Sequence, residues 1–388
     1  MNAEVTYPRE TLRAYFYLRH VSKCLRYVAA GFFKGHVSEA TLCSPFPLIP
    51  GYKNLCNFSD VTYGNSWYCG RPRKLGLTCA DWHSVRDMEF TRPFALSDVD
   101  MSLTEQLRKP PLLRLIPSTV ILHVDKGTPI RPEKACPGKH FQDTWQLDRP
   151  RGYFLHKQWV RSDCRRQWPD PPTDAACLTN TTIVFTGDSN FLSWFVILKS
   201  RLGCELVIEQ GTTTWHRPRS CVRADVNFHM SWRLHGFPNH PVSDHWAPRS
   251  DFLEVTDQLD SVPDRGRYVV AIHLFLHYSI HHYSVLYSRL LAVRKAAESL
   301  LDRNPDALVM VRGPHTAYSG WPPVLGGDMA GPLMRELTVR AFRGVHERVL
   351  YLDFWDMSTA SENSEFHPEL YINEAMVQVF LDHVCSNS

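Results

Sequence analysis

The chain has 388 residues, of which 44% are hydrophobic and 21% charged, a composition typical of a globular protein with room for two domains. Its 43 basic and 40 acidic side chains give a formal charge of only +3, and the one short basic cluster is Arg161, Arg165 and Arg166. These features argue against a disordered chain and against nucleic acid as a partner.

Cysteine usage and glycosylation signals point to the secretory pathway. None of the 11 cysteines lies in a Cys-x-x-Cys pair, which favours disulfides over a zinc ribbon, and the odd number predicts one thiol that is free or paired between chains. Sequons at Asn57 and Asn180 agree with a secreted protein or one in the lumen of the ER or Golgi. The sequence shows no signal peptide and no membrane-spanning run, so we expect an N-terminal signal or anchor to be missing from it.

The first third of the chain reads as short β-type stretches separated by turns. Leu12–Leu18 and Pro117–Asp125 are candidate strands, and residues 63–66 form a turn signal. Helical periodicity of useful length is absent, so residues 1–130 predict a β-sandwich. Residues 131–178, which are rich in Cys, Pro and Trp, predict a linker.

From residue 179 to 388, strands alternate with helices. The predicted strands are Thr182–Thr186, Cys204–Gln210, Arg267–Phe275, Ala307–Val311 and Val349–Trp355. The predicted helices are Asn190–Leu202, Tyr283–Arg303, Leu333–Glu347 and about Leu370–Val384. This alternation predicts a parallel sheet covered on both faces, with ligands bound at the carboxyl ends of the strands.

A candidate nucleophile lies where the first of these strands passes into its helix. Gly187 permits a tight turn that exposes the hydroxyl of Ser189, and the helix N-terminus offers N–H groups and a positive dipole end to an oxyanion. The alternative is that Ser189 or Asp188 only caps the helix. The sequence of the turn alone favours capping.

A candidate base lies at the other end of this region. His367 follows the last predicted strand and precedes the last helix, so it belongs to the same sheet edge as Ser189. A serine nucleophile needs such a base, and the base needs an orienting acid. The acids near His367 in sequence are Asp353, Asp356, Glu362 and Glu365.

Other aromatic and imidazole side chains allow further interpretations. A metal site is conceivable at His273, His277, His281 and His282. We do not expect metal there, because His273 falls in a β-type run and strand geometry separates the rings. Three tryptophans could line a sugar pocket, although aromatic residues in such folds more often belong to the core: Trp194, Trp232 and Trp355.

Several motifs together resemble the neurexophilin and PC-esterase domain (NXPE) family over most of the chain. They are Cys56–Asp60 with Trp67–Cys69 and Cys79, Trp159 with Cys164 and Cys177, Phe185–Ser189 with Trp194, Trp232–Pro238, Leu276–Tyr278, Val293–Ala296, Asp353–Met357, His367-Pro368 and Cys385. The resemblance implies an SGNH-type three-layer α/β/α domain, a preceding immunoglobulin-like β-sandwich truncated at its N-terminus, and no cofactor.

The resemblance also implies roles for residues. Ser189 would be the nucleophile and His367 the base, but the aspartate that SGNH enzymes usually place three residues before the histidine is Ser364 here. The orienting acid is therefore assigned to Asp356, with Asp353 as the alternative. Candidate oxyanion or substrate contacts are the Ser189 backbone, Gly236, His277 and Asp188.

Three functions are compatible with this sequence. The first is an esterase or O-acetyltransferase that acts on glycans such as sialic acids, with an acetyl donor in the case of transfer. The second is an inactive secreted protein that binds a cell-surface partner, as neurexophilins do, and it is favoured by Ser364 and by the bulky Phe275 and Leu276. The third is a structural glycoprotein module. The intact Ser189 and His367 favour the enzyme.

Overall fold

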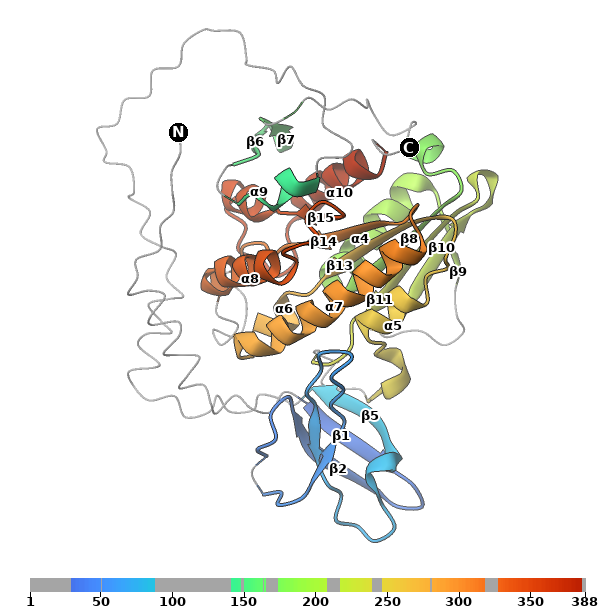
Figure 1. Cartoon of the computed structure of the whole chain (residues 1–388), viewed down its shortest axis with the longest axis vertical. Coiled ribbons are helices and arrows are strands. Elements are labelled where there is room, and N and C mark those ends of the chain that lie inside the picture. Colours follow the sequence, from blue (N-terminus) through green and yellow to red (C-terminus); the bar gives the residue numbers. More distant parts are fainter. Residues whose placement is uncertain are drawn as a thin grey trace, which may run out of the picture.

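The computed structural model describes residues 29–49, 51–87, 141–147, 150–162, 164, 174–207, 217–238, 246–279, 281–317 and 327–385. Figure 1 shows an α/β body with a smaller β-sheet, drawn in blue, at one end of it. A short hairpin lies at the opposite end of the body.

A mixed sheet forms the centre of the α/β body. Its strand order is β15-β14-β13-β8-β11-β10-β9. The five strands from β15 to β11 pair in parallel, whereas β10 pairs antiparallel with both of its neighbours, β11 and β9. The strands are β8 (Thr181–Gly187), β9 (Glu205–Val207), β10 (Arg219–Arg223), β11 (Phe228–Leu234), β13 (Arg267–His273), β14 (Leu308–Arg312) and β15 (Val349–Leu352). The predicted parallel sheet is thus extended by an antiparallel edge, and β10 and β11 have no counterpart among the predicted strands.

Helices cover both faces of this sheet. They are α4 (Ser189–Leu202), α5 (Val255–Asp260), α6 (Leu276–Ser279), α7 (Tyr283–Arg303), α8 (Gly327–Ala341), α9 (Trp355–Ala360) and α10 (Leu370–Cys385). Along β13, Val269 and Ala271 join the core under α4 and α10, whereas Val270 and Ile272 join the core under α5, α7 and α8. Alternate side chains of the strand therefore enter opposite cores, which confirms the three layers.

The N-terminal part forms a second sheet with the strand order β12-β5-β1-β2-β4-β3. Its strands are β1 (Ala29–Lys34), β2 (Ser38–Ser44), β3 (Leu55–Asn57), β4 (Tyr68–Gly70), β5 (Trp82–Asp87) and β12 (Ala247–Pro248). β12 comes from the α/β part of the sequence, so the two parts share this sheet. The immunoglobulin-like sandwich stays a prediction, since Leu12–Leu18 and Pro117–Asp125 lie outside the described residues.

The predicted linker contains structure that docks on the α/β body. Its described elements are η3 (Phe141–Trp145), β6 (Gly152–Leu155), β7 (Gln158–Arg161) and α3 (Asp174–Cys177). The indole of Trp145 donates a hydrogen bond to the carbonyl of Val349 (2.8 Å), and the Thr144 hydroxyl accepts one from the amide of Tyr351 (2.9 Å). These contacts fix the segment to β15, at one edge of the sheet.

Disulfides fasten both parts of the molecule. They join Cys43 to Cys69, Cys56 to Cys79, Cys177 to Cys385 and Cys204 to Cys221. Cys164 is also disulfide-bonded, while Cys24 and Cys136 lie outside the described residues. Within the described ranges, no helix is both long and apolar enough to cross a bilayer. The disulfides fit an extracellular or lumenal protein.

Candidate active site

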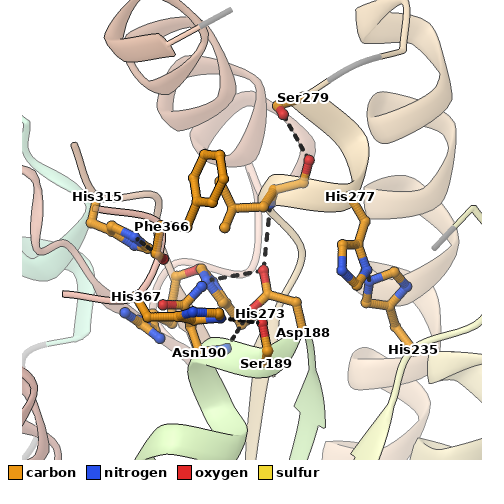
Figure 2. Close-up of polar contacts among 12 residues, drawn as sticks. Asp188, Ser189, Asn190, His235, His273, His277, Ser279, His315, Phe366 and His367 are labelled. Atoms are coloured by element: carbon orange, nitrogen blue, oxygen red, sulfur yellow. Dashed lines mark hydrogen bonds and ion pairs between the residues drawn. The ribbon is translucent and has the colours of Figure 1, made fainter. Parts of the chain in front are cut away.

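The structure brings the predicted nucleophile and base together. Ser189 is the first residue of α4, directly after β8, and His367 lies in the loop between α9 and α10. The Ser189 Oγ and His367 Nε2 are 2.6 Å apart, within hydrogen-bonding distance (Figure 2). Both residues lie at the carboxyl edge of the parallel strands, and the His367 ring is exposed.

Asp188 caps α4, which leaves the Ser189 hydroxyl for the histidine. One carboxylate oxygen of Asp188 accepts a hydrogen bond from the amide of Asn190 (2.9 Å), and the other accepts one from the amide of Leu276 (3.4 Å). The helix starts one residue earlier than predicted because Asp188, and not Ser189, is the N-cap. The capping alternative thus holds for Asp188 and leaves Ser189 in position for chemistry.

The carboxylate of Asp188 is ionised although it is wholly buried. Burial opposes ionisation, but electrostatic interactions with His273, His277 and Arg312 outweigh it and hold the pKa of Asp188 well below its usual range. Burial lowers the pKa of His273 to about 4, so His273 is neutral at neutral pH. Burial lowers the pKa of Arg312 to about 9, so Arg312 stays charged. Arg312 is therefore the lasting counter-charge of Asp188.

A pair of histidines lies on the other side of Ser189 from His367 (Figure 2). His235 Nδ1 is 2.6 Å from the carbonyl oxygen of Gly236, so this nitrogen carries a proton and donates it. In neutral His235 the Nε2 then accepts a hydrogen bond from His277 Nδ1, at 2.9 Å. In its neutral form His277 therefore has an acceptor and no proton at Nε2, so it lacks the N–H that an oxyanion contact requires.

Gly236 lies at the same sheet edge as Ser189. β11 ends at Leu234, which is the parallel partner of Gly187, so both chains leave the sheet side by side. A Cβ atom built on Gly236 would overlap the carboxylate of Glu254, so the loop can pass this point only as glycine. This position keeps Gly236 as a candidate oxyanion contact.

Among the described residues, no carboxylate contacts the ring of His367. The Asp356 carboxylate accepts hydrogen bonds from the amides of Arg151 (2.6 Å) and Met357 (2.7 Å), and burial together with Asp353 raises its pKa to about 6. Asp353 pairs with the guanidinium of Arg335, whose Nε is 3.0 Å away. Within the described part of the chain, Ser189 is the only hydrogen-bond partner of the His367 ring. The assignment of Asp356, or of Asp353, as the orienting acid is therefore corrected.

Three buried residues near the site are not among the site residues predicted from the sequence. Arg312 ends β14, His315 follows it at the same edge, and Asn373 lies in the first turn of α10. His315 donates a hydrogen bond to the carbonyl of Phe366 (3.0 Å), directly before His367. The signal that could have found Arg312 and His315 is their place at the carboxyl end of a predicted strand.

Other predicted residues lie apart from the site. Asn57 and Asn180 are exposed, as glycan acceptors must be. Trp194 and Trp232 are fully buried in the core and do not line a sugar pocket. Among the described residues, no group of three or more His, Cys, Asp or Glu side chains is arranged to hold a metal ion.

Comparison with known proteins gives a family match and distant structural likenesses. The family described as "NXPE family member 4-like, C-terminal domain" matches residues 159–385, more than half of the chain. A protein described as a GDSL-like lipase from Parabacteroides merdae ATCC 43184 is 13% identical, with a TM-score of 0.32, over 53% of this chain and 96% of that one. An active-site mutant of a family two carbohydrate esterase from Clostridium thermocellum is 14% identical, with a TM-score of 0.30, over 52% of this chain and 62% of that one.

Proposed function

This chain belongs to the NXPE family, and from that membership we propose that it is a glycan acyl esterase or O-acyltransferase with Ser189 as the nucleophile and His367 as the base. The observation that carries the proposal is the 2.6 Å contact between Ser189 Oγ and His367 Nε2. The contact lies at the N-terminus of α4, where backbone N–H groups are unpaired within the helix. This arrangement supports a nucleophile, a base and an oxyanion site at one point of the sheet edge.

The reaction follows from this geometry in two steps. His367 Nε2 takes the proton of the Ser189 hydroxyl while Oγ attacks the acyl carbonyl carbon, and the oxyanion forms near the Ser189 amide and Gly236. The intermediate then expels the sugar oxygen, which takes the proton back from His367. Water or a second sugar hydroxyl next gives its proton to His367 and attacks the acyl-serine. Ser189 Oγ then leaves and takes that proton from His367, which releases a carboxylic acid or a new ester.

The state of His367 in this mechanism is set by its contact with Ser189. To accept the serine proton, Nε2 must be unprotonated, so the neutral ring carries its proton on Nδ1. Among the described residues, no carboxylate meets Nδ1. Within that part of the chain the proposed site therefore consists of Ser189 and His367, without an orienting acid.

The substrate class is the finer part of the proposal. Disulfides and exposed sequons support a protein that meets glycans in the secretory pathway, with O-acyl groups on sugars, sialic acids included, as the acyl carriers. The absence of an orienting acid among the described residues favours the second candidate, an inactive secreted protein that binds a cell-surface partner. Phe275 and Leu276 are bulky and buried, and the amide of Leu276 bonds Asp188 next to the nucleophile, which also favours this second candidate.

A serine-reactive fluorophosphonate probe tests the proposal. We expect the disulfide-bonded protein to be labelled at Ser189, and we expect Ser189→Ala and His367→Ala to lose the label. Ser193→Ala is a matched control, because Ser193 lies one turn further along α4 and its hydroxyl bonds only the carbonyl of Ser189 (3.3 Å). Labelling that survives Ser189→Ala, or that never occurs in correctly folded protein, would count against catalysis and favour the binding protein.

A further inference from the structure

Two buried side chains hold the main chain on either side of His367. His315 Nε2 donates a hydrogen bond to the carbonyl of Phe366 at 3.0 Å, and Asn373 Nδ2 donates one to the carbonyl of Pro368 at 2.6 Å. We propose that His315 and Asn373 are positioning residues, which orient the His367 ring through its flanking carbonyls. This inference rests on the proposed function, in which His367 is the base.

His315 is suited to this task because it has only one proton to donate. Its side chain is fully buried, and burial holds its pKa well below its usual range, so the ring is neutral. The single proton must lie on Nε2, since a carbonyl oxygen only accepts. The ring also packs edge-on against Phe275, with centroids 5.2 Å apart. The donor is therefore fixed in direction and does not titrate in the physiological range.

Asn373 holds the other side of His367 in the same way. It lies in the first turn of α10 and is 3% exposed, and its amide reaches back to the Pro368 carbonyl. Its own amide oxygen has no partner within the described residues. A buried side chain that leaves one polar atom unpaired is costly, so its placement calls for a specific role. The bond to Pro368 supplies that role.

A second pair of contacts fixes the same loop further from His367. The Thr316 hydroxyl donates to the carbonyl of Asn363 (2.7 Å), and the Asn363 side-chain amide bonds back to the carbonyl of Thr316. The neighbouring residues His315 and Thr316 thus bind the loop at Phe366 and at Asn363. The exposed ring of His367 then varies only in its own torsions and not in the position of its backbone.

The hydrogen bonds of His315 and Asn373 take over one of the two functions of a triad acid. Such an acid orients the imidazole and also stabilises its charged form. Here orientation comes from hydrogen bonds to the main chain, while no described carboxylate supplies the charge. The proposal explains how Ser189 and His367 meet at 2.6 Å although Ser364 stands where the family's fold normally has an aspartate.

Two substitutions of His315 test the proposal in the full chain. His315→Leu removes the donor, and we expect it to lower the rate of fluorophosphonate labelling of Ser189 by about 10- to 100-fold, since small misplacements of a catalytic group have effects of this size. His315→Gln keeps an N–H near the position of Nε2, and we expect it to restore the rate to within about threefold of wild type. His346→Leu is the matched control, because His346 Nε2 makes the same kind of bond to the carbonyl of Val339 (3.0 Å) away from the site.

A second measurement does not depend on activity. In protein labelled with ¹⁵N-histidine, with His367→Ala used for assignment, we expect His315→Leu to shift the His367 ring signals toward those of a freely moving imidazole. Unchanged His367 signals with an unchanged labelling rate would overturn the proposal, as would an equal loss of labelling in His346→Leu. If wild type shows no labelling that depends on Ser189, the proposed function fails, and the spectra alone decide the positioning role.

Discussion

The two sides of Ser189 are built from different parts of the molecule. On one side, the loop that carries His367 is held by His315 and Asn373, both from the α/β body. On the other side, the segment with Gly236 is followed by Phe237, whose ring stacks on Trp67 of the N-terminal part with centroids 4.9 Å apart. The described contacts that hold the candidate base thus come from the α/β body, whereas the oxyanion side, with Gly236 as the candidate oxyanion contact, packs against the N-terminal part.

A buried ion pair also links the segment with Gly236 to the N-terminal part. Arg289 of α7 pairs with Glu254 and donates to the carbonyls of Phe237 and, at 2.8 Å, of Tyr63. Glu254 in turn accepts a hydrogen bond from the side chain of Asn65, at 3.1 Å. The same carboxylate lies against Gly236 and would overlap any larger residue there. Contacts between the two parts of the chain therefore determine the path of the Gly236 loop.

Substitutions should therefore be able to disturb one side of Ser189 without the other. Damage at the interface should disturb the oxyanion side while His367 keeps its position, and damage near His315 should do the reverse. Two readouts separate the cases: the labelling rate of Ser189 reports both sides, and the ring signals of His367 report only the base.

Substitution of Arg289 should have the largest effect. Arg289→Met leaves the carboxylate of Glu254 buried without its counter-charge, which typically costs about 3–5 kcal/mol of folding free energy. We expect a correspondingly lower free energy of unfolding in a denaturant titration, and slower labelling of Ser189, because the Phe237 carbonyl loses its donor. Arg294→Met is the control on the same helix: its partly exposed pair with Glu298 should be worth only about 0.5 kcal/mol. Equal losses in both variants would contradict a special role for the interface.

The raised pKa of Asp356, the residue predicted to orient His367, should make the free energy of unfolding depend on pH. Burial raises its folded-state pKa from 3.8 to about 6, so the folded protein binds this proton more tightly than the unfolded chain. The stabilising effect is present below about pH 4, and it is lost as pH rises through 6. Relative to Asp356→Asn, wild type should therefore gain about 1.3 kcal/mol in free energy of unfolding between pH 7 and pH 5.

The rate at which Ser189 is labelled in Asp356→Asn shows whether Asp356 also contributes to the reactivity of the site. Since the Asp356 carboxylate bonds the amides of Arg151 and Met357 and does not meet His367, we expect Asp356→Asn to be labelled within about threefold of the wild-type rate. A loss of the size expected for His367→Ala would restore Asp356 as the orienting acid.

Local features of the site could be predicted from the sequence, whereas contacts between distant segments could not. The glycine turn and the helix start at Ser189 depend on neighbouring residues, and the place of His367 follows from the order of strands and helices. Asp356 bonds the amide of Arg151, which is 205 positions away, and no local sequence pattern predicts this contact. For the same reason the acid was assigned by proximity in sequence, and the structure corrects it.

The same distinction applies to the fold. Buried parallel strands such as β8 and β13 are continuous apolar runs, and they were predicted close to their observed bounds. β11 alternates apolar and polar residues around Trp232, and β10 is short with polar residues at three of its five positions. Neither strand is a continuous apolar run, and neither is among the predicted strands. The start of α8 was placed six residues too late, at Leu333 instead of Gly327, because Gly331 and Pro332 disfavour a helix interior.

A substitution at Phe237 should cost little stability and act on the Gly236 side of the site. Phe237 packs against Trp67, Trp82 and Phe252, so Phe237→Leu should cost only about 1 kcal/mol, chiefly from lost ring stacking. We expect labelling of Ser189 to fall several-fold while the ¹⁵N signals of the His367 ring stay unchanged, because the substitution touches the oxyanion side only. Phe342→Leu, at a buried ring stacked on Trp145 away from the site, controls for stability and should leave both readouts unchanged. A shift of the His367 signals in Phe237→Leu would show instead that the two sides of Ser189 are coupled.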